Sequence, residues 1–399
     1  MRFNPVAVPE IELSSVILDI AAGPFGSNLK VSCFVPDGFP IIDGANLKGY
    51  KVTDNVTKFV TDEKAHSLER SIAHRGDVVS TISGTLGQIA YIPDDSKYEG
   101  YLCSQRQFRI TFDTEKVYVP YIVYYFHTRE GQHKILSFAS QVGVPALAQP
   151  LKNFRKIRLR LPHIEDQRRI AAVIESLNER IEHNWRINDN LLQQLQVFYQ
   201  LMFGKASQSS EPEWHLSDIC AYSQRRVAVS SLSLESYYST ENMLPGKAGA
   251  VAASSMPTIA QTTGCKPGDI LISNIRPYFK KIVYVQSECG CSTDVLCFVP
   301  MTSDLSPYLY STLYNDHFFD YMVAGSKGTK MPRGDKQQIM AYPIVLPSQT
   351  QLAEFNAIAQ PILARIEAGK QENKHLASMR DTLLPKLMSG EIDVSGIGI

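Results

Sequence analysis

The sequence predicts an α+β fold in which a globular domain of short strands and helices is followed by a long helix, and this arrangement occurs twice. Two observations predict it: two long stretches with a helical apolar pattern, and a set of short motifs that recurs in order. The long stretches run from Ile164 to Gly204 and from Gln349 to Gly390. A helix of that length extends roughly 60 Å, about twice the core of a small domain, so we expect a spacer or a partner-binding arm.

The first long stretch has the apolar spacing of a coiled coil. Its apolar residues recur in alternating steps of three and four, which places them on one seam of a helix. The middle of the seam is polar, at Asn184 and Asn188. No glycine or proline interrupts the stretch before Gly204, which suits a helix C-terminus. The predicted apolar seam consists of Ile174, Leu177, Ile181, Leu191, Leu195, Phe198 and Met202.

The second long stretch repeats this design, with apolar ends and a polar middle. Antiparallel pairing of the two helices as a coiled coil would place Asn184 and Asn188 beside Arg365 and Glu372. Polar seam residues of this kind fix the register of a coiled coil. Pro361 lies inside the stretch, so we expect it to kink the second helix or to delay its start. The predicted seam consists of Phe355, Ile358, Ile362, Arg365, Gly369, Glu372, Leu376, Met379 and Leu383.

Five short motifs occur twice along the chain, in the same order and 185 to 192 residues apart. One shared dipeptide would mean little, but an ordered set at nearly constant spacing indicates an internal repeat. Because each long helix can bury its seam against the other, the repeat also predicts a pseudo-twofold axis. The motif pairs are Gly76–Val79 and Gly268–Leu271, Cys103-Ser104 and Cys291-Ser292, Pro120–Ile122 and Pro307–Leu309, Leu161-Pro162 and Leu346-Pro347, and Leu201–Gly204 and Leu387–Gly390.

The repeat and a polar linker define the predicted domains. The pattern of each globular domain predicts short strands separated by turn residues, with helical segments near its end. The predicted division is 1–160 for the first globular domain, 161–204 for the first long helix, 205–212 for the linker, 213–346 for the second globular domain, 347–390 for the second long helix and 391–399 for a C-terminal tail.

The composition is that of an ordinary globular protein without a net charge. The 399 residues include 40 basic and 40 acidic side chains. This balance argues against a nucleic-acid binder that works by bulk positive charge, but it fits a local basic face or a subunit that shares its ligand with basic partners. No long apolar run and no signal-peptide pattern occurs, so we expect a cytoplasmic protein. The seven cysteines lack histidines at metal-ligand spacing, so we predict no metal site.

The sequence also lacks the motifs of an enzyme. Gly84 and Gly87 are not followed by the Gly-Lys-Ser/Thr of a phosphate loop, and a tight turn between strands is favoured there. No Gly-rich cofactor loop follows a strand, and no NPPY- or DPPY-type loop for base methylation occurs. Two similar domains joined by a rigid spacer suit a two-part ligand. DNA is the obvious one, because the spacing of two half-sites then follows from protein geometry.

The chain resembles the specificity (S) subunits of type I restriction–modification systems, and the resemblance covers essentially its whole length. It rests on the two Leu-Pro junctions that lead into the long helices, Leu159–Ile181 and Ile344–Ile362. The segments Gly76–Gly87 and Gly268–Pro277 and the matching ends of the two long helices add to it.

The second junction departs from the usual pattern of this family. A glutamine follows the junction proline by five residues in the first repeat, from Pro162 to Gln167, but by four in the second, from Pro347 to Gln351. The difference leaves the start of the second long helix open.

The resemblance implies that each globular domain is a target-recognition domain for one half of an interrupted DNA sequence. It implies that the paired helices set the unread gap and bind two methyltransferase (M) subunits, and that nuclease/translocase (R) subunits join the complex. The chain itself would do no chemistry and hold no cofactor, with S-adenosylmethionine, ATP and Mg²⁺ on the partner subunits. The alternative is a DNA-recognition or assembly scaffold of another methylation or phage-defence complex. A self-contained nuclease or methyltransferase would need motifs that are missing.

The candidate DNA contacts are polar and basic residues on predicted loops, because base edges are read by polar side chains and phosphates by Lys, Arg and backbone amides. The first domain supplies Asn46, Lys48, Ser83, Thr85, Gln105, Arg106, Gln107, Gln141 and Lys152. The second domain supplies Asn274, Arg276, Lys280, Lys281, Lys327, Lys330 and Arg333. The strongest local pattern is the basic, glycine-punctuated loop from Lys327 to Lys336. The alternative interpretation of each candidate is a solvated surface or turn residue that does not contact DNA.

Two further groups have two interpretations. Helix residues outside the seam form a candidate M-subunit surface, although Trp185 equally fits packing in the coiled coil. Aromatic residues near strands fit stacking on DNA or, more commonly, packing in a core. The helix residues are Arg168, Arg169, Arg180, Trp185 and Arg186, and the aromatic residues are Tyr50, Tyr91, Tyr101 and Phe279.

Overall fold

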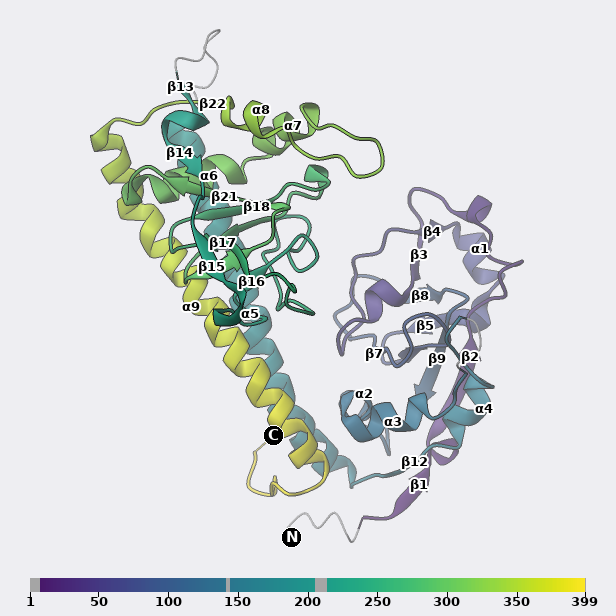
Figure 1. Ribbon diagram of the computed structural model, residues 1–399. Coiled ribbons are helices and arrows are strands. Elements are labelled where there is room, and N and C mark those ends of the chain that lie inside the picture. Colours follow the sequence, from purple (N-terminus) through teal and green to yellow (C-terminus); the bar gives the residue numbers. More distant parts are fainter. Residues whose placement is uncertain (1–7, 141–143, 205–213, 399) are drawn as a thin grey trace. The chain divides into compact units, whose positions relative to one another are not determined.

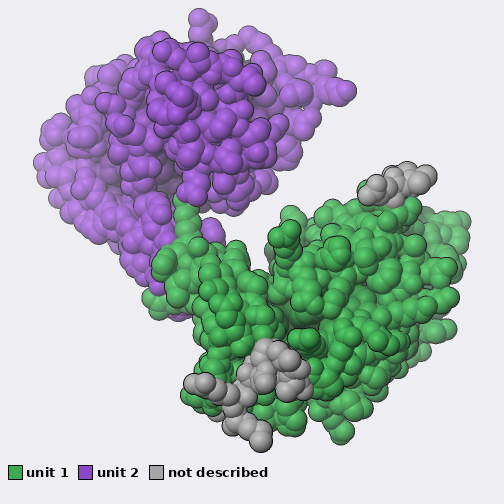
Figure 2. Space-filling model, turned by 60° about the horizontal axis from the view of Figure 1, so that its bottom comes forward, with its two compact units in different colours: residues 1–181, 374–399 green, residues 182–373 purple. Residues whose placement is uncertain are grey.

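The computed structural model describes residues 8–140, 144–204 and 214–398 (Figure 1). The candidate Gln141 and the predicted linker lie outside these ranges. The chain divides into two compact units, which Figure 2 shows in different colours. Unit 1 comprises residues 1–181 and 374–399, and unit 2 comprises residues 182–373.

Unit 1 is built on two four-stranded sheets. One is wholly antiparallel, in the order β2 (Ile17–Ala22), β9 (Gln107–Phe112), β6 (Val78–Thr81) and β7 (Ile89–Tyr91). The other has the order β4 (Phe59–Val60), β3 (Phe39–Ile42), β8 (Gly100–Cys103) and β5 (Ile72–His74), with β3 and β8 parallel. Two short pairs are β1 (Glu10–Glu12) with β12 (Arg158–Arg160), and β10 (Ala139–Ser140) with β11 (Ala146–Leu147). The helices of the domain are α1 (Asp62–His66), α2 (Val119–His127), α3 (Arg129–Leu136) and α4 (Pro150–Arg155).

Unit 2 follows the same plan. Its antiparallel sheet has the order β14 (Cys220–Tyr222), β21 (Val295–Pro300), β18 (Ile270–Ser273) and β19 (Ile282–Tyr284). Its second sheet has the order β15 (Arg226–Ala228), β17 (Gln261–Cys265), β20 (Cys289–Cys291) and β16 (Tyr237–Tyr238), with β16 and β20 parallel. A short pair joins β13 (Trp214–His215) to β22 (Pro343–Ile344). The helices are α6 (Ser306–Tyr314), α7 (Asp316–Ala324) and α8 (Lys336–Met340).

The antiparallel sheet of each unit is covered on both faces. Successive strand residues point to opposite faces, and on β6 Val78 and Val79 enter two different apolar clusters. Ile270 and Leu271 do the same on β18 in unit 2. One cluster includes α2 or α6, and the other includes the second sheet. This double burial explains why adjacent residues are apolar at Val78-Val79 and at Ile270-Leu271, where a half-exposed strand would alternate apolar with polar residues.

The two long helices are α5 (Ile164–Phe203) and α9 (Gln349–Met388), each of 40 residues, and they pack together as predicted. In unit 1, Tyr121 and Tyr124 of α2 share a cluster with Ile170 of α5 and Leu384 of α9. In unit 2, α6, the second half of α5 and the first half of α9 meet in one cluster. Each domain therefore packs on the helix pair through the helix that follows the last strand of its antiparallel sheet, α2 in unit 1 and α6 in unit 2.

The polar middle of the seam is present, but its partners on α9 differ from the prediction. Asn184 donates from Nδ2 to Oδ1 of Asn373 at 2.9 Å, and the Asn188 amide lies against Gly369, which has no side chain to displace it. The predicted partners Arg365 and Glu372 lie one position before the buried Ile366 and Asn373. The seam also rotates near the helix ends, because the predicted seam residues Phe198 and Met379 are 37% and 39% exposed.

Gln167 locks the first junction in place. Its side chain is fully buried, accepts from the Tyr118 amide at 2.8 Å and donates to the carbonyls of Lys116 and Pro162, both at 2.8 Å. In unit 2 the corresponding tether comes from Asn356, which donates to the Asp304 carbonyl at 2.7 Å. Both tethers reach the chain just before the helix that packs on the helix pair.

Gln351 has a different role at the second junction. Its side-chain Oε1 accepts from the Ser348 backbone amide at 3.0 Å. Its backbone amide donates to the Ser348 hydroxyl at 3.2 Å, so the two residues form a reciprocal cap on α9. The helix starts at Gln349 and continues through Pro361, so the expected delay of its start is wrong. Pro361 and Ala357 are both exposed, so water can reach the Ala357 carbonyl that the proline leaves without a donor.

Within the described ranges, no helix is both long enough and apolar enough to cross a membrane.

Candidate DNA-recognition surfaces

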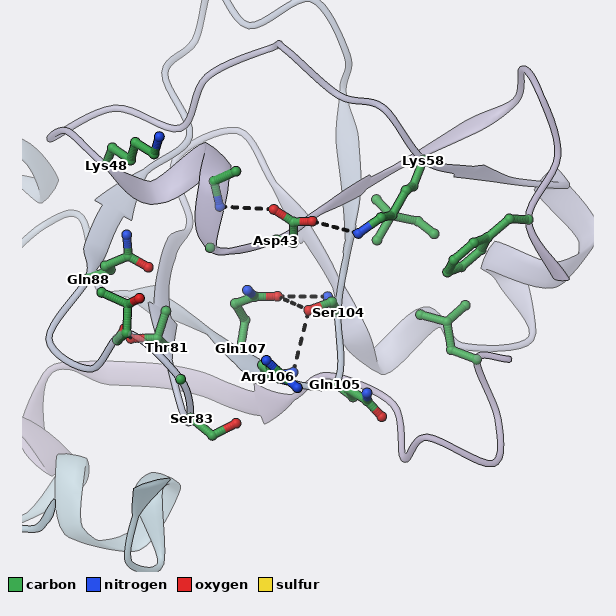
Figure 3. Close-up of a pocket in the computed structure, with 17 residues that line it drawn as sticks. Asp43, Lys48, Lys58, Thr81, Ser83, Gln88, Ser104, Gln105, Arg106 and Gln107 are labelled. Atoms are coloured by element: carbon green, nitrogen blue, oxygen red, sulfur yellow. Dashed lines mark hydrogen bonds and ion pairs between the residues drawn. The ribbon is translucent and has the colours of Figure 1, made fainter. Parts of the chain in front are cut away.

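The loops of unit 1 that carry candidate residues converge on one hollow of about 500 Å³ (Figure 3). The connection between β6 and β7 forms one wall and the connection between β8 and β9 another. The short helix at Gly44–Leu47 and the residue after it close the hollow. Six of the predicted residues line it, namely Lys48, Ser83, Thr85, Gln105, Arg106 and Gln107.

Two cations in this hollow have side chains without an ion pair or hydrogen bond to any described residue. Lys58 is not one of them, because its Nζ lies 2.8 Å from Oδ2 of Asp43. Partial burial alone would raise the pKa of Asp43, but hydrogen bonds from Lys58 and the Ala45 amide hold it below its usual range. Lys48 and Arg106 are exposed, and their side chains make no ion pair or hydrogen bond with any residue that the structure describes. These two cations are therefore available to an anionic ligand.

Two of the predicted residues are occupied inside the fold. Gln107 is 1% exposed, and its Oε1 accepts from the amide and the hydroxyl of Ser104. Asn46 is 4% exposed, accepts from the Asp43 amide and donates to the carbonyls of Thr53 and Asn55. Both side-chain amides stabilise their own turns, so neither is available to a DNA base.

Sequence reasoning missed other residues that line the hollow. Gln88 has a buried Oε1 without a hydrogen-bond partner among the described residues, and Figure 3 shows it beside Thr81 and Lys48. Its place directly after Gly87, at the end of the turn, was the available signal. Lys152 lies on α4 and is exposed, but it does not line the hollow.

In unit 2, the candidates gather where the β18–β19 connection meets the loop between α7 and α8. Arg276 donates its amide to the Pro332 carbonyl at 2.8 Å, and Ile275 pairs with Arg333 in an isolated bridge. Asn274, just before them, is 8% exposed, and its Oδ1 has no partner within the described chain. Two loops far apart in the sequence thus form one surface.

Three of the six predicted cations of unit 2 pair with a carboxylate within the fold, and a fourth donates to a backbone carbonyl. Four of them have partners, and Arg276 and Lys330 have no ion pair with any described residue. The four contacts are Lys280 with Asp316 at 2.8 Å, Lys281 with the Thr240 carbonyl at 2.5 Å, Lys327 with Asp335 at 2.6 Å, and Arg333 with Asp294 at 3.0 Å.

The cysteines of unit 2 are part of its core. Cys265, Cys289, Cys291 and Cys297 are all buried in the cluster behind β18. Hydrogen bonding with the neighbouring Cys265 and burial raise the pKa values of the Cys291 and Cys297 thiols, which keeps them protonated. In the described part of the chain, no group of three or more His, Cys, Asp or Glu side chains is placed to hold a metal ion.

The outer face of α5 exposes both basic and apolar residues. Trp185 is 52% exposed, so it does not pack inside the coiled coil. Val197 and Leu201 are 57% and 72% exposed on the same helix. Two of the predicted arginines have local partners, because Arg169 pairs with Asp166 at 3.0 Å and Arg168 lies over the Tyr118 ring.

Comparisons with known proteins agree with this architecture. Residues 36–193 match the family described as the type I restriction modification DNA specificity domain. The type I restriction enzyme MjaIX specificity subunit of Methanocaldococcus jannaschii is 20% identical over 94% of this chain and 91% of its own length. The crystal structure of the type I restriction–modification S subunit from M. genitalium has the same fold, with a TM-score of 0.58 at 15% identity, covering 97% of this chain and 98% of that one.

Residues 36–193 thus match the type I restriction modification DNA specificity domain, and nearly the whole chain is similar in sequence to one type I specificity subunit and in fold to another.

Proposed function

We propose that the chain reads an interrupted DNA site, with unit 1 recognising one half and unit 2 the other, and directs methyltransferase and restriction subunits to it. The observation that carries this proposal is the repeat itself. The connection after the central strand, β6 in unit 1 and β18 in unit 2, lies on a surface with exposed or unpaired cations in both units. This reading is favoured over a scaffold of some other defence complex, because the relatives are specificity subunits.

In unit 1, the chemistry of the hollow suits DNA. The unpaired Lys48 and Arg106 would contact phosphates, and the uncharged Ser83, Thr85 and Gln105 would reach base edges. The residues 1–160 and 213–346 are the proposed target-recognition domains, and the long helices at 161–204 and 347–390 are the proposed spacer.

The partner subunits supply the chemistry in this proposal. The chain itself is not an enzyme and holds no cofactor, whereas S-adenosylmethionine, ATP and Mg²⁺ bind to the methyltransferase and restriction subunits in the cytoplasm. Two methyltransferase subunits dock on the helices. The exposed Val197 and Leu201, which lie one turn apart on α5, support this, because large apolar side chains left in water on a helix face mark interaction surfaces.

DNA binding by the purified chain, alone and with its methyltransferase subunit, tests the proposal. The neutral chain should bind weakly by itself, since neutralising phosphates supplies most non-specific affinity. The complex should prefer one site over competitor DNA. Arg106→Ala removes a proposed phosphate contact and should weaken DNA binding by the complex, whereas Lys152→Ala, an exposed lysine outside the hollow, should not and serves as its matched control. A complex that binds all DNA sequences equally would rule the proposal out.

A further inference from the structure

The connection between β6 and β7 in unit 1 makes two fixed contacts. It spans residues 82–88, and Ser83 pairs with Ala146 in an isolated bridge. The next amide, that of Gly84, donates to the Pro145 carbonyl at 3.0 Å. These two contacts attach the turn to Pro145 and Ala146, at the start of β11.

The connection between β18 and β19 in unit 2 makes the same two contacts. It spans residues 274–281, and Ile275 pairs with Arg333 in an isolated bridge. The next amide, that of Arg276, donates to the Pro332 carbonyl at 2.8 Å. Arg276 therefore occupies in unit 2 the place that Gly84 occupies in unit 1.

The backbone at these places is left-handed in both units. Gly84 and Gly87 have φ values of 88° and 83°, whereas Arg276 and Lys280 have φ values of 50° and 51°. Glycine adopts this conformation without strain, but an L-residue with a side chain does not. Unit 2 thus retains two strained side chains at bends that unit 1 makes with glycine. Strain of this kind concentrates at functional sites.

Contacts inside the fold explain only one of these two side chains. The Lys280 ammonium lies 2.8 Å from Oδ1 of Asp316, which it shares with Lys247. The Arg276 guanidinium makes no ion pair or hydrogen bond with any residue in the described ranges, and its Nε is buried without a partner. A side chain held at a cost in strain and left unsatisfied within the fold is available for an external ligand.

An aromatic pair stands beside Arg276. Tyr278 and Phe279 form the short helical turn between the two strained residues, with ring centroids 4.7 Å apart. They are 50% and 39% exposed, although aromatic residues next to strands usually pack into a core. Exposed aromatic rings beside an arginine suit a ligand with flat faces and hydrogen-bond acceptors, which is what DNA bases offer.

We infer that Arg276 is the principal base-reading residue of unit 2, that it selects guanine at one position of its half-site, and that Tyr278 and Phe279 pack against the DNA beside it. Arginine binds guanine O6 and N7 with two parallel hydrogen bonds, the commonest specific contact between proteins and DNA. This inference rests on the proposed function of unit 2.

The test is methylation by the complete complex on a library of sites with every single-base substitution. Arg276→Gly places in unit 2 the residue that unit 1 uses at the same bend, so the variant should fold. Discrimination at one guanine position should fall about 5- to 150-fold, the range expected for one bidentate contact, with the rest of the motif unchanged. Arg276→Lys, which keeps the charge but loses the planar fork, should relax the same position and decides the matter if the glycine variant unfolds.

Two controls separate base reading from other effects. Lys280→Gly removes the other strained side chain and should leave the motif unchanged. Lys330→Ala removes an exposed cation of the neighbouring loop and should weaken methylation evenly at all sequences. An unchanged motif in both Arg276 variants, or the same relaxation in Lys280→Gly, would overturn the inference. Failure of the proposed function would look different, because the wild-type complex would then show no two-part site at all.

Discussion

The buried glutamine at the first junction gives the sharpest test of how a recognition domain is fixed to its helix. We expect Gln167→Ala to loosen that attachment, because the substitution leaves three backbone groups without a partner. These are the Tyr118 amide, which donates to Oε1, and the carbonyls of Lys116 and Pro162, which accept from Nε2.

The expected magnitude follows from these three bonds. A buried polar group left unsatisfied costs about 1–3 kcal/mol. Lys116 is exposed, so water can partly replace its bond, and the lower end of the range applies. We therefore expect a loss of roughly 3 kcal/mol in the free energy of opening this junction, which is about 150-fold in the opening equilibrium.

Hydrogen exchange measures this loss where it occurs. The Tyr118 amide and the first turns of α2 and α5 should exchange faster in Gln167→Ala, while unit 2 stays unchanged. Asn356→Ala is the matched control, because Asn356 makes a single bond to the Asp304 carbonyl and should cost only about 1 kcal/mol. The reasoning fails if the two variants lose equal protection, or if exchange rises throughout the chain rather than at the junction.

Three further predictions concern the spacer, packing and charge. A four-residue insertion after Asn188 lengthens a helix by roughly 6 Å. It should change the length of the gap in the methylated site and leave the bases of both half-sites unchanged. Altered half-site bases would mean that α5 is not a spacer. Gly131→Ala should destabilise unit 1 by about 1–3 kcal/mol in thermal unfolding, because the new Cβ would lie 2.2 Å from the Tyr125 carbonyl oxygen, whereas Gly49→Ala has open space and should change little. Hydrogen bonds from two lysines lower the pKa of Asp316 to about 2, below its ordinary 3.8. Its stabilising contribution is therefore complete above about pH 4 and lost as the pH falls toward 2, so the stability difference between wild type and Asp316→Asn should vanish over that interval.

The repeated architecture could be predicted because it depends on patterns that one sequence displays. The helical periodicity of residues 164–203 and 349–388 reports burial of one helix face directly. The ordered motifs report a second copy of the same sheet, which β6 and β18 occupy at corresponding positions. Both patterns can be recognised without knowing any tertiary contact.

The exact seam could not be predicted, because it depends on contacts between helices. Asn373 is a polar residue that a search for apolar spacing passes over, yet it is buried against Asn184. Phe198 fits the spacing, yet it is partly exposed because the buried face rotates where α5 meets α6. Only the tertiary neighbours decide which of two adjacent residues faces the partner helix.

The lining of the hollow in unit 1 was predicted only in part, for a similar reason. Residue type and loop position identified Lys48 and Arg106, which the fold brings to one hollow. The same criteria also selected Asn46 and Gln107, whose amides are used inside their own turns. A single sequence does not show which polar groups are already satisfied, and that property separates available contacts from structural ones.

Sequencing the methylated bases in a host that carries the complete system tests the central claim most directly. The claim predicts one motif made of two short specific halves separated by a fixed stretch of unspecified bases. Gln105→Ala in unit 1, which removes a proposed base contact, should then alter one half, and Arg276→Gly in unit 2 the other. A single uninterrupted motif, or one in which both variants change the same half, would contradict it.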